Sequence, residues 1–258
     1  MDTFLSSPDT WISLITLTFL EIVLGIDNII FISIVTGKLP EENRKKATRL
    51  GLLFAMFLRI GLLFGITLLI RMKATLLSFD WGWFSANLTG QAVILLLGGL
   101  FLIYKSTKEI HEKVDHKGEE AESLKNTAVK SFSGVIIQIL LIDMIFSVDS
   151  ILTAVGMTNG LEGALYIMIA AVIIAVSIMM LFAVPVGNFV NKNPSIQILG
   201  LAFLILIGFM LITESMHLSE AELAGKTIGT VPKGYLYFAI AFSLIVEFLN
   251  MKMRKRKK

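Results

Sequence analysis

Long apolar blocks separated by polar connections dominate the pattern of the chain. Seven blocks of about 15–27 residues contain few charged side chains. Each block is long enough to cross a bilayer core of about 30 Å as a helix that rises about 1.5 Å per residue. The pattern therefore predicts an all-α membrane protein with seven transmembrane helices, at Trp11–Gly37, Leu50–Ile70, Leu88–Tyr104, Phe132–Met157, Leu161–Val186, Ile196–Thr213 and Gly234–Met251.

Two of the predicted spans carry a matching motif. EIVLGIDNII (Glu21–Ile30) in the first span aligns without gaps with DMIFSVDSIL (Asp143–Leu152) in the fourth, and Asp27 pairs with Asp149. Because each copy would contain three spans, the second copy enters the membrane from the opposite side. Inverted repeats of this kind are typical of transporters, whose sites lie near the bilayer midplane. We therefore expect a 3+3 inverted repeat plus one C-terminal helix.

The repeat also predicts how the chain is divided. A weaker echo relates Gly98–Ile103 in the third span to Gly200–Ile205 in the sixth. The expected parts are a first three-helix repeat, a charged cytosolic loop, a second three-helix repeat, and an outer loop with the seventh helix and a basic tail. Their ranges are residues 1–107, 108–131, 132–213 and 214–258.

Charge changes this picture by adding an orientation. Of the 23 Lys and Arg residues, 18 fall in segments on one side of the predicted membrane, four on the other, and Arg59 within a span. Cytosolic segments of membrane proteins carry such an excess of basic residues. We therefore expect the N-terminus outside the cell and the C-terminus in the cytosol. The net charge of +3 then reflects orientation, so the expected partner is the lipid bilayer and not nucleic acid.

Charged side chains within the predicted spans need a partner or a function. An Asp or Arg at the centre of a transmembrane helix costs about 2.5–3.5 kcal/mol on insertion scales. Arg59 is the one cation among them, and it cannot neutralise the five acids Glu21, Asp27, Asp143, Asp149 and Glu247. A cation-binding role is favoured for Asp27 and Asp149, and is about as strong as a structural role for Glu21 and Asp143. Arg59 itself is expected to be a structural counter-charge.

Helix geometry limits how these residues can share one ion. Residues seven apart lie on one helix face, so Glu21 stacks with Asn28, whereas residues six apart face different ways. Glu21 and Asp27 therefore cannot both face one ion from a regular helix. Either the helices unwind around Gly25–Asn28 and Ser147–Ser150, or the two acids belong to different coordination shells of the ion. The first alternative is favoured because unwinding frees carbonyl ligands.

The candidate ligands define the class of ion. They are carboxylate, amide and hydroxyl oxygens, which suit hard cations such as Mg²⁺, Ca²⁺ and Mn²⁺. The chain has no cysteine, and its three histidines lie between the spans, which argues against zinc and copper. The candidate metal ligands are Asp27, Asp149, Asn28, Ser150, Glu21 and Asp143.

At EIVLGIDN and FSVDSI the sequence resembles the TerC family of bacterial membrane proteins. The resemblance extends to KLP after the first span and to VPKGYLYFA (Val231–Ala239) at the start of the last one. It implies a multi-pass protein of the bacterial inner membrane, similar to the wider lysine-exporter superfamily. It also implies a role in metal-ion homeostasis, most often Mn²⁺ export, and in some contexts tellurite resistance. The motif acids of the family map onto Asp27 and Asp149, with Asn28 and Ser150 beside them.

Two functions are compatible with these features. The first is export of a divalent cation, with Mn²⁺ as first candidate, driven by proton exchange at the same carboxylates and needing no cofactor beyond the transported ion. The second is a non-transporting membrane scaffold that assists metal loading or tellurite resistance. Paired midplane acids favour the transporter. An enzyme is not expected, because the spans hold no nucleophile–base pair, and the oligomeric state is left open.

Overall fold

Seven long helices make up most of the part of the chain that the structure describes. The computed structural model describes residues 7–65, 74–115, 131–158, 160–161 and 163–256. All seven helices in this part of the chain are long and apolar enough to cross a membrane, which confirms the expected number of spans. They are α2 (Pro8–Thr36), α3 (Glu41–Phe64), α5 (Gly90–Asp115), α6 (Phe132–Thr158), α7 (Ala164–Lys192), α8 (Pro194–Leu218) and α9 (Lys233–Arg256).

The starts of three helices follow from local sequence. Pro8 and Pro194 lie in the first turns of α2 and α8, where a missing N–H costs nothing. Glu41 and Glu42 open α3 directly after Pro40, and acidic side chains favour the positive end of a helix dipole. These three helices therefore begin in polar sequence at or before the start of their apolar blocks.

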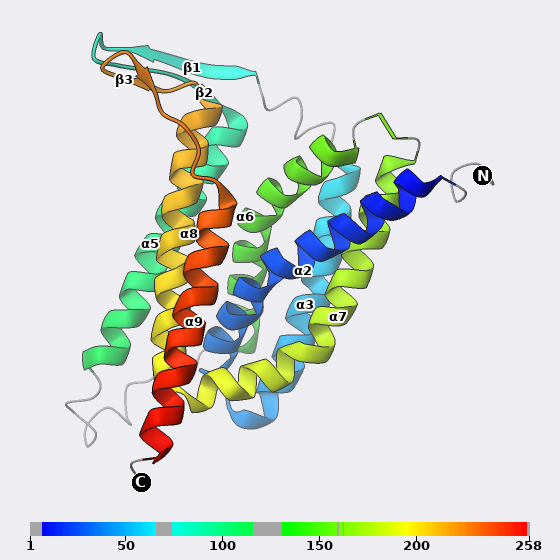
Figure 1. Cartoon of the computed structure of the whole chain (residues 1–258), viewed down its shortest axis with the longest axis vertical. Helices are drawn as coiled ribbons and strands as arrows, with labels where there is room; N and C mark the ends of the chain where they lie inside the picture. Colours follow the sequence, from blue (N-terminus) through cyan, green and yellow to red (C-terminus); the bar gives the residue numbers. More distant parts are fainter. Residues whose placement is uncertain (1–6, 66–73, 116–130, 159, 162, 257–258) are drawn as a thin grey trace. The chain divides into compact units, whose positions relative to one another are not determined.

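The helices belong to two compact units. Unit 1 comprises Met1–Arg71 and Val129–Asn191, and unit 2 comprises Met72–Ala128 and Lys192–Lys258. Unit 1 thus contains α2, α3, α6 and α7, and unit 2 contains α5, α8 and α9 (Figure 1). Each unit takes helices from both of the three-helix segments expected from the sequence repeat.

Small residues allow the helices of unit 1 to approach closely. A Cβ atom at Gly51 on α3 would lie 2.8 Å from Cδ1 of Ile139 on α6. A Cβ atom at Gly187 on α7 would lie 3.0 Å from the Ser33 hydroxyl on α2, and one at Gly25 would overlap the Met179 sulfur. Glycine at these positions is therefore what brings α3 against α6 and α2 against α7.

Pro185 lies inside α7, which bends along its length (Figure 1). A proline within a helix removes one backbone hydrogen bond and crowds the carbonyl four residues earlier, which bends the helix. The helix nevertheless continues to Lys192, beyond the expected end of the fifth span at Val186.

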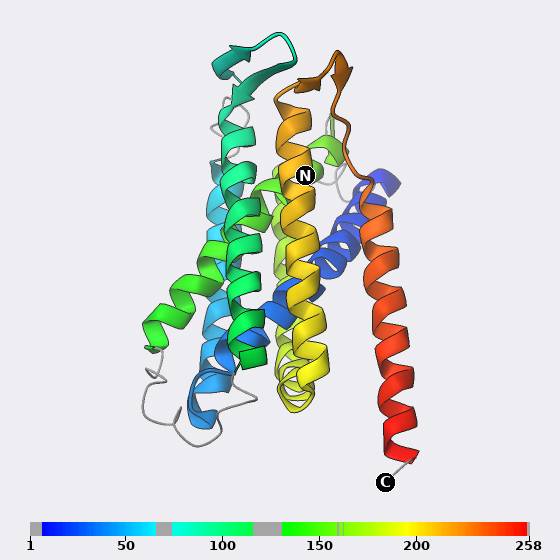
Figure 2. The same cartoon turned by 90° about the vertical axis from the view of Figure 1, so that its left-hand side faces the viewer.

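In unit 2, α5 and α8 run antiparallel and are joined at three levels (Figure 2). The Ser215 hydroxyl donates to the carbonyl of Ala92 at 2.6 Å near one end, and Lys113 donates to the Gln197 side chain near the other. Between these levels, Gly99 and Gly208 meet backbone to backbone. A Cβ atom at Gly99 would lie 2.5 Å from the Gly208 carbonyl oxygen, and one at Gly208 would lie 2.8 Å from that of Gly99.

This glycine contact is reciprocal in its side chains as well. The Cβ position of Gly99 faces Ile212, and that of Gly208 faces Ile103, each at 2.8 Å from the isoleucine Cγ1. Gly99 and Gly208 are 109 residues apart, as are Ile103 and Ile212, whereas the sequence echo between Gly98–Ile103 and Gly200–Ile205 relates positions 102 apart. The contact between α5 and α8 therefore pairs positions that are shifted by seven residues, or one heptad, from the positions that the sequence echo pairs.

A small antiparallel sheet, absent from the sequence prediction, joins the ends of α5 and α8. Its strand order is β1-β2-β3-β4, and it caps one end of unit 2 (Figure 2). The sheet forms there because β2 leads directly into the start of α5, while β3 and β4 follow the end of the antiparallel α8. The strands are β1 (Thr75–Asp80), β2 (Phe84–Thr89), β3 (Glu222–Leu223) and β4 (Lys226–Thr227).

Short turns make both hairpins possible. Gly82 between β1 and β2 has a φ of 77°, and its N–H donates to the Asp80 carboxylate at 2.9 Å. Ala224 and Gly225 between β3 and β4 have φ values of 52° and 74°. Two consecutive residues with positive φ form the tight turn that suits the twist of a hairpin.

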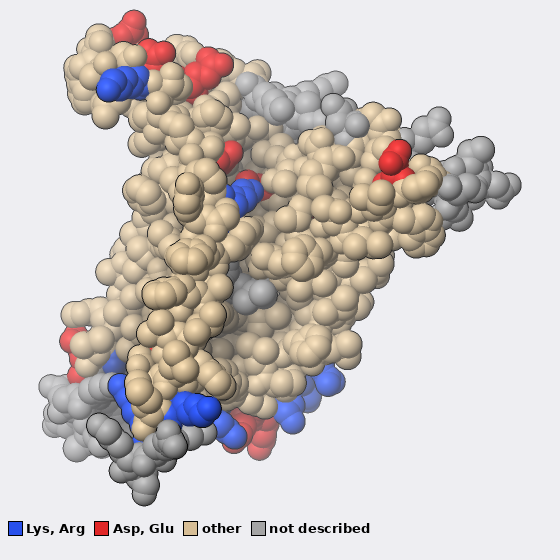
Figure 3. All heavy atoms as spheres, in the orientation of Figure 1, with Lys and Arg blue, Asp and Glu red and all other residues tan. Residues whose placement is uncertain are grey.

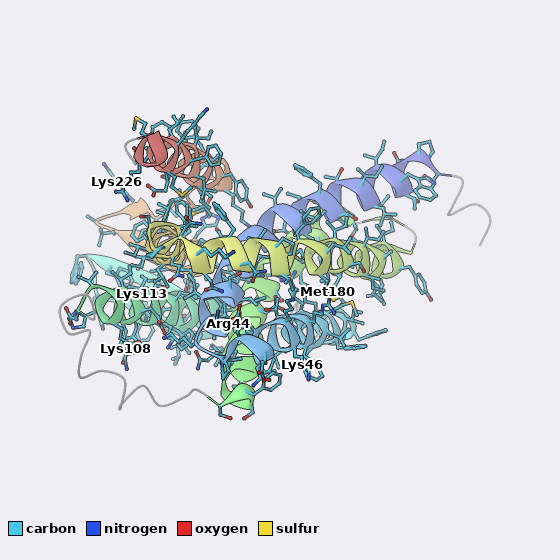
Figure 4. All side chains as sticks on the ribbon, turned by 90° about the horizontal axis from the view of Figure 1, so that it is seen from below. Arg44, Lys46, Lys108, Lys113, Met180 and Lys226 are labelled. Atoms are coloured by element: carbon cyan, nitrogen blue, oxygen red, sulfur yellow. The ribbon has the colours of Figure 1, made fainter. Side chains whose placement is uncertain are left out.

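The basic side chains of α5 lie in one half of the helix. Lys105, Lys108 and Lys113 lie in the half of α5 remote from the sheet, and Figure 4 labels the last two. On the face shown in Figure 3, the surface over the helices is mostly uncharged, and acidic side chains gather at the sheet. This distribution suits helices whose middles lie in lipid. Exposed apolar residues of α9 fit the same environment and include Phe238, Phe242, Ile245, Phe248 and Leu249.

We expect Gly99→Ala to destabilise unit 2 strongly for a one-carbon change. The new methyl group would meet the Gly208 carbonyl, which cannot move away without separating the helices. Overpacking of this kind typically costs about 1–3 kcal/mol, so the thermal unfolding midpoint in detergent should fall. Gly61→Ala on α3 is the matched control, because a Cβ atom there meets nothing within 4 Å. Equal midpoints for the two variants would contradict the close helix contact.

Candidate functional site

A buried charge cluster lies among the helices of unit 1. It contains Glu21 from α2, Arg59 from α3 and Asp143 from α6. Asn28 lies on the same face of α2 as Glu21, two turns further on. The helices hold these side chains together because α2, α3 and α6 all pack against one another.

Arg59 bridges the two acids. Its Nη2 atom donates to Asp143 Oδ1 at 2.6 Å, and its Nε atom lies 3.2 and 3.1 Å from the two carboxylate oxygens of Asp143. Its Nη1 atom donates to Glu21 Oε2. The guanidinium thus grips Asp143 from the side with two nitrogens and reaches Glu21 with the third.

All three side chains are buried. The exposed fractions of Glu21, Arg59 and Asp143 are 6%, 3% and 6%. With both carboxylates ionised, the cluster carries a formal charge of −1. Burying an ion pair is tolerable only if hydrogen bonds satisfy its remaining atoms. An excess negative charge at membrane depth therefore favours a cation and repels anions.

Two further polar residues complete the cluster. Asn28 donates from Nδ2 to Asp143 Oδ1 at 3.3 Å, and the Ser147 hydroxyl lies 3.3 Å from Asp143 Oδ2. The Oδ1 atom of Asn28 is buried and finds no hydrogen-bond partner within the described part of the chain. A buried acceptor without a donor is costly, so this oxygen is available to a ligand that the protein itself does not provide.

The predicted ligands divide between this cluster and its surroundings. Glu21, Asn28 and Asp143 come together in the structure, and Glu21 and Asn28 share one face of α2, as their spacing of seven residues predicts. Ser150 is buried on the Asp143 face of α6, and its hydroxyl donates to the Ser147 carbonyl at 3.3 Å. Arg59 was expected to be a structural counter-charge. It contacts Glu21 and Asp143, two of the acids that were expected to be metal ligands.

The remaining two acids lie elsewhere on the same helices. Asp149 is half-buried and lies six residues after Asp143, about 120° away around α6. Asp27 belongs to α2, but its side chain lies outside the described residues. Across the described part of the chain, His, Asp and Glu side chains do not gather as a group of three or more that could hold a metal.

The expected unwinding of the two motif helices is wrong. α2 continues from Pro8 to Thr36 and α6 from Phe132 to Thr158, through both motifs. A regular helix pairs its own backbone N–H and C=O groups, whereas an unpaired backbone group exposed to lipid would cost several kcal/mol. The Ser147 hydroxyl donates to the Asp143 carbonyl at 2.6 Å, one turn earlier, which also suits a continuous helix. The other alternative, that acids six residues apart belong to different coordination shells, is the one left.

Comparison with known proteins decides the family. The family described as "Integral membrane protein TerC family" matches residues 6–258. The chain belongs to the TerC family. Its relatives include the "UPF0053 inner membrane protein YgdQ" of Escherichia coli K12, 49% identical over 98% of this chain and 97% of the relative. A "UPF0053 protein" of Haemophilus influenzae is 45% identical over 99% of both chains.

Another relative is longer than this protein. The "UPF0053 inner membrane protein YoaE" of Escherichia coli K12 is 40% identical over 98% of this chain but only 45% of its own length. No solved structure matches the chain. With seven apolar helices and relatives named inner membrane proteins, this TerC-family chain is a multi-pass protein of the bacterial inner membrane.

Proposed function

We propose that this TerC-family protein exports a divalent metal cation across the inner membrane, with Mn²⁺ as the substrate that the family resemblance implies. The observation that carries the proposal is the buried, net negative cluster around Arg59, in which Asn28 Oδ1 has no described partner. Buried charges in membrane proteins are costly and usually mark ion pathways. A non-transporting scaffold would need no such group.

The six candidate ligands would then serve two positions along the path. Glu21, Asn28 and Asp143, with Ser150 on the same face of α6, would form one position. Asp27 and Asp149 would form the other, because each lies six residues from the matching acid of its motif. All six offer hard oxygen atoms, which suit Mn²⁺, Ca²⁺ and Mg²⁺ better than Zn²⁺.

The proposal is tested by cation flux into or out of liposomes that contain the purified full-length protein. We expect Mn²⁺ flux well above that of empty liposomes and little Zn²⁺ flux. If proton exchange at the carboxylates drives export, acidifying the receiving side at clamped voltage should speed the flux. Flux that does not change with the imposed pH gradient would exclude proton antiport and leave facilitated exit of the cation as the mechanism. No flux of any divalent cation by folded protein would reject the transporter and favour the scaffold.

We further propose that the N-terminus is outside and the C-terminus is cytosolic. The distribution of 18 basic residues against four supports this orientation. Reporter fusions after Lys46, Lys117 and Lys258 should all report the cytosol, and one after Gly225 should report the outside. A cytosolic signal at Gly225 would contradict the orientation.

A further inference from the structure

The guanidinium of Arg59 lies between the buried carboxylates of Glu21 and Asp143. We propose that Arg59 is an internal substitute for the transported cation. In the empty site its Nη1 atom holds Glu21, and an arriving divalent cation displaces that N–H while Asp143 keeps the rest of the guanidinium. This inference rests on the proposed export function and adds how the same site is emptied and reset.

The contacts of Arg59 are unequal, which identifies the one that yields. Asp143 receives Nη2 at 2.6 Å and Nε at 3.1 and 3.2 Å, a two-nitrogen grip of the kind that gives the strongest ion pairs. Asp143 also accepts a hydrogen bond from Asn28. Glu21 is held by Nη1. The Glu21 contact can therefore break while Arg59 stays anchored on α6.

The unpaired oxygen of Asn28 lies where a second ligand is needed. Asn28 and Glu21 are seven residues apart and share one face of α2. The Nδ2 atom of Asn28 is engaged with Asp143, while Oδ1 is buried and has no partner among the described residues. When Nη1 leaves, the Glu21 carboxylate and this amide oxygen would both face the vacated position. Carboxylate and amide oxygens are ligands of hard divalent cations.

Charge explains why a transporter would carry its own substitute cation. Without Arg59 the two buried acids would carry a formal charge of −2, and a site of this kind would be costly to leave empty at membrane depth. With Arg59 the empty cluster carries −1. The cation also competes with Nη1 of Arg59 for Glu21. Its apparent affinity is therefore the intrinsic affinity multiplied by the fraction of time for which Glu21 is released. Arg59 thus promotes release of the cation and permits the empty transporter to return.

The test separates binding, exchange and net transport in the purified full-length protein. Arg59→Lys keeps a positive charge but, as a single ammonium group, cannot grip Asp143 and reach Glu21 together. We expect its apparent affinity for Mn²⁺ to rise at least about tenfold, because the competing state is depopulated. Exchange of Mn²⁺ for Mn²⁺ across liposomes should persist, while net export should fall at least about tenfold.

Arg49→Lys is the matched control, because Arg49 lies exposed on the same helix. It should leave affinity and both fluxes unchanged. A folded Arg59→Lys variant with wild-type affinity and a wild-type ratio of exchange to net export would overturn the inference, since a purely structural Arg59 would lower the unfolding temperature without separating the two fluxes.

Glu21→Gln decides the question even if Arg59→Lys fails to fold. This change leaves Arg59 paired with Asp143, so the cluster becomes formally neutral. We expect Mn²⁺ to bind at least about tenfold more weakly, with both fluxes reduced, and unchanged binding would overturn the inference. Wild-type protein that neither binds nor moves any divalent cation would instead reject the proposed function itself.

Discussion

Asp149→Asn and Asp27→Asn are each expected to abolish Mn²⁺ flux in liposomes while the protein still folds. Asparagine keeps the size of the side chain and removes the charge, which costs a few kcal/mol to hold at membrane depth. If these acids were only tolerated, their removal would leave flux intact and stability equal or higher. If they bind the cation, flux should fall to the level of empty liposomes although the unfolding temperature is kept or raised.

The double variant and a control sharpen this prediction. Two groups that act on one ion are not additive, so the double variant should be no worse than either single one. Asp9→Asn, at an exposed acid in the first turn of α2, should behave as wild type. Wild-type transport by both single variants at matched protein levels would remove Asp27 and Asp149 from the proposed site.

Arg59→Met is expected to cause the largest loss of stability of any single change in the cluster. Methionine preserves much of the volume of arginine, but it leaves Glu21 and Asp143 buried without their counter-charge. Removing one partner of a buried ion pair typically costs about 3–5 kcal/mol. The thermal unfolding midpoint of the purified protein should therefore fall steeply, and the amount of protein in the membrane should fall with it.

Neutralising the acids as well should restore most of this stability. In the triple variant Arg59→Met, Glu21→Gln, Asp143→Asn, no buried charge is left without a partner. Replacing a whole buried ionic group by neutral residues is often harmless or stabilising. A triple variant as unstable as Arg59→Met alone would show that the shape of the arginine, and not charge balance, maintains the bundle.

Hydropathy predicted the part of each helix that suits lipid, but not every helix end. α3 begins at Glu41 and not at Leu50, because the charged residues before Leu50 are good helix formers that also extend the helix into water. α5 continues to Asp115, eleven residues beyond the expected end at Tyr104, and carries an ion pair between Lys105 and Glu109, one turn apart, at 3.2 Å. Apolarity ends at the membrane surface, whereas helical hydrogen bonding does not.

The site was partly predictable from the repeat. The gap-free alignment of the two motifs matched Glu21 with Asp143, and the structure brings these two acids onto the same guanidinium. A single intramembrane cation beside matched acids was a sufficient signal for such a bridge. Counting all the charges in the spans obscured this bridge, because Arg59 was compared with all five acids together. The relevant comparison was with Glu21 and Asp143, the pair at equivalent positions of the two motifs.

The sheet was not predicted because its signals are local and short. β1 and β2 each have six residues, and β3 and β4 have two. Asp80 and Gly82 flank Trp81 in the turn between β1 and β2. Pairing of β2 with β3 depends on the antiparallel contact of α5 with α8, and short strands carry no sequence pattern that reveals such a partner.

The three connections between α5 and α8 also have a mechanical consequence. Their hydrogen bonds near both ends and the glycine contact between them leave no level at which one helix can slide or tilt against the other. We therefore expect α5 and α8 to move as one rigid pair during any transport cycle. Flexing within unit 1 is easiest where Pro185 has already removed a hydrogen bond from α7. This makes the proline bend, and not the α5–α8 pair, the natural hinge.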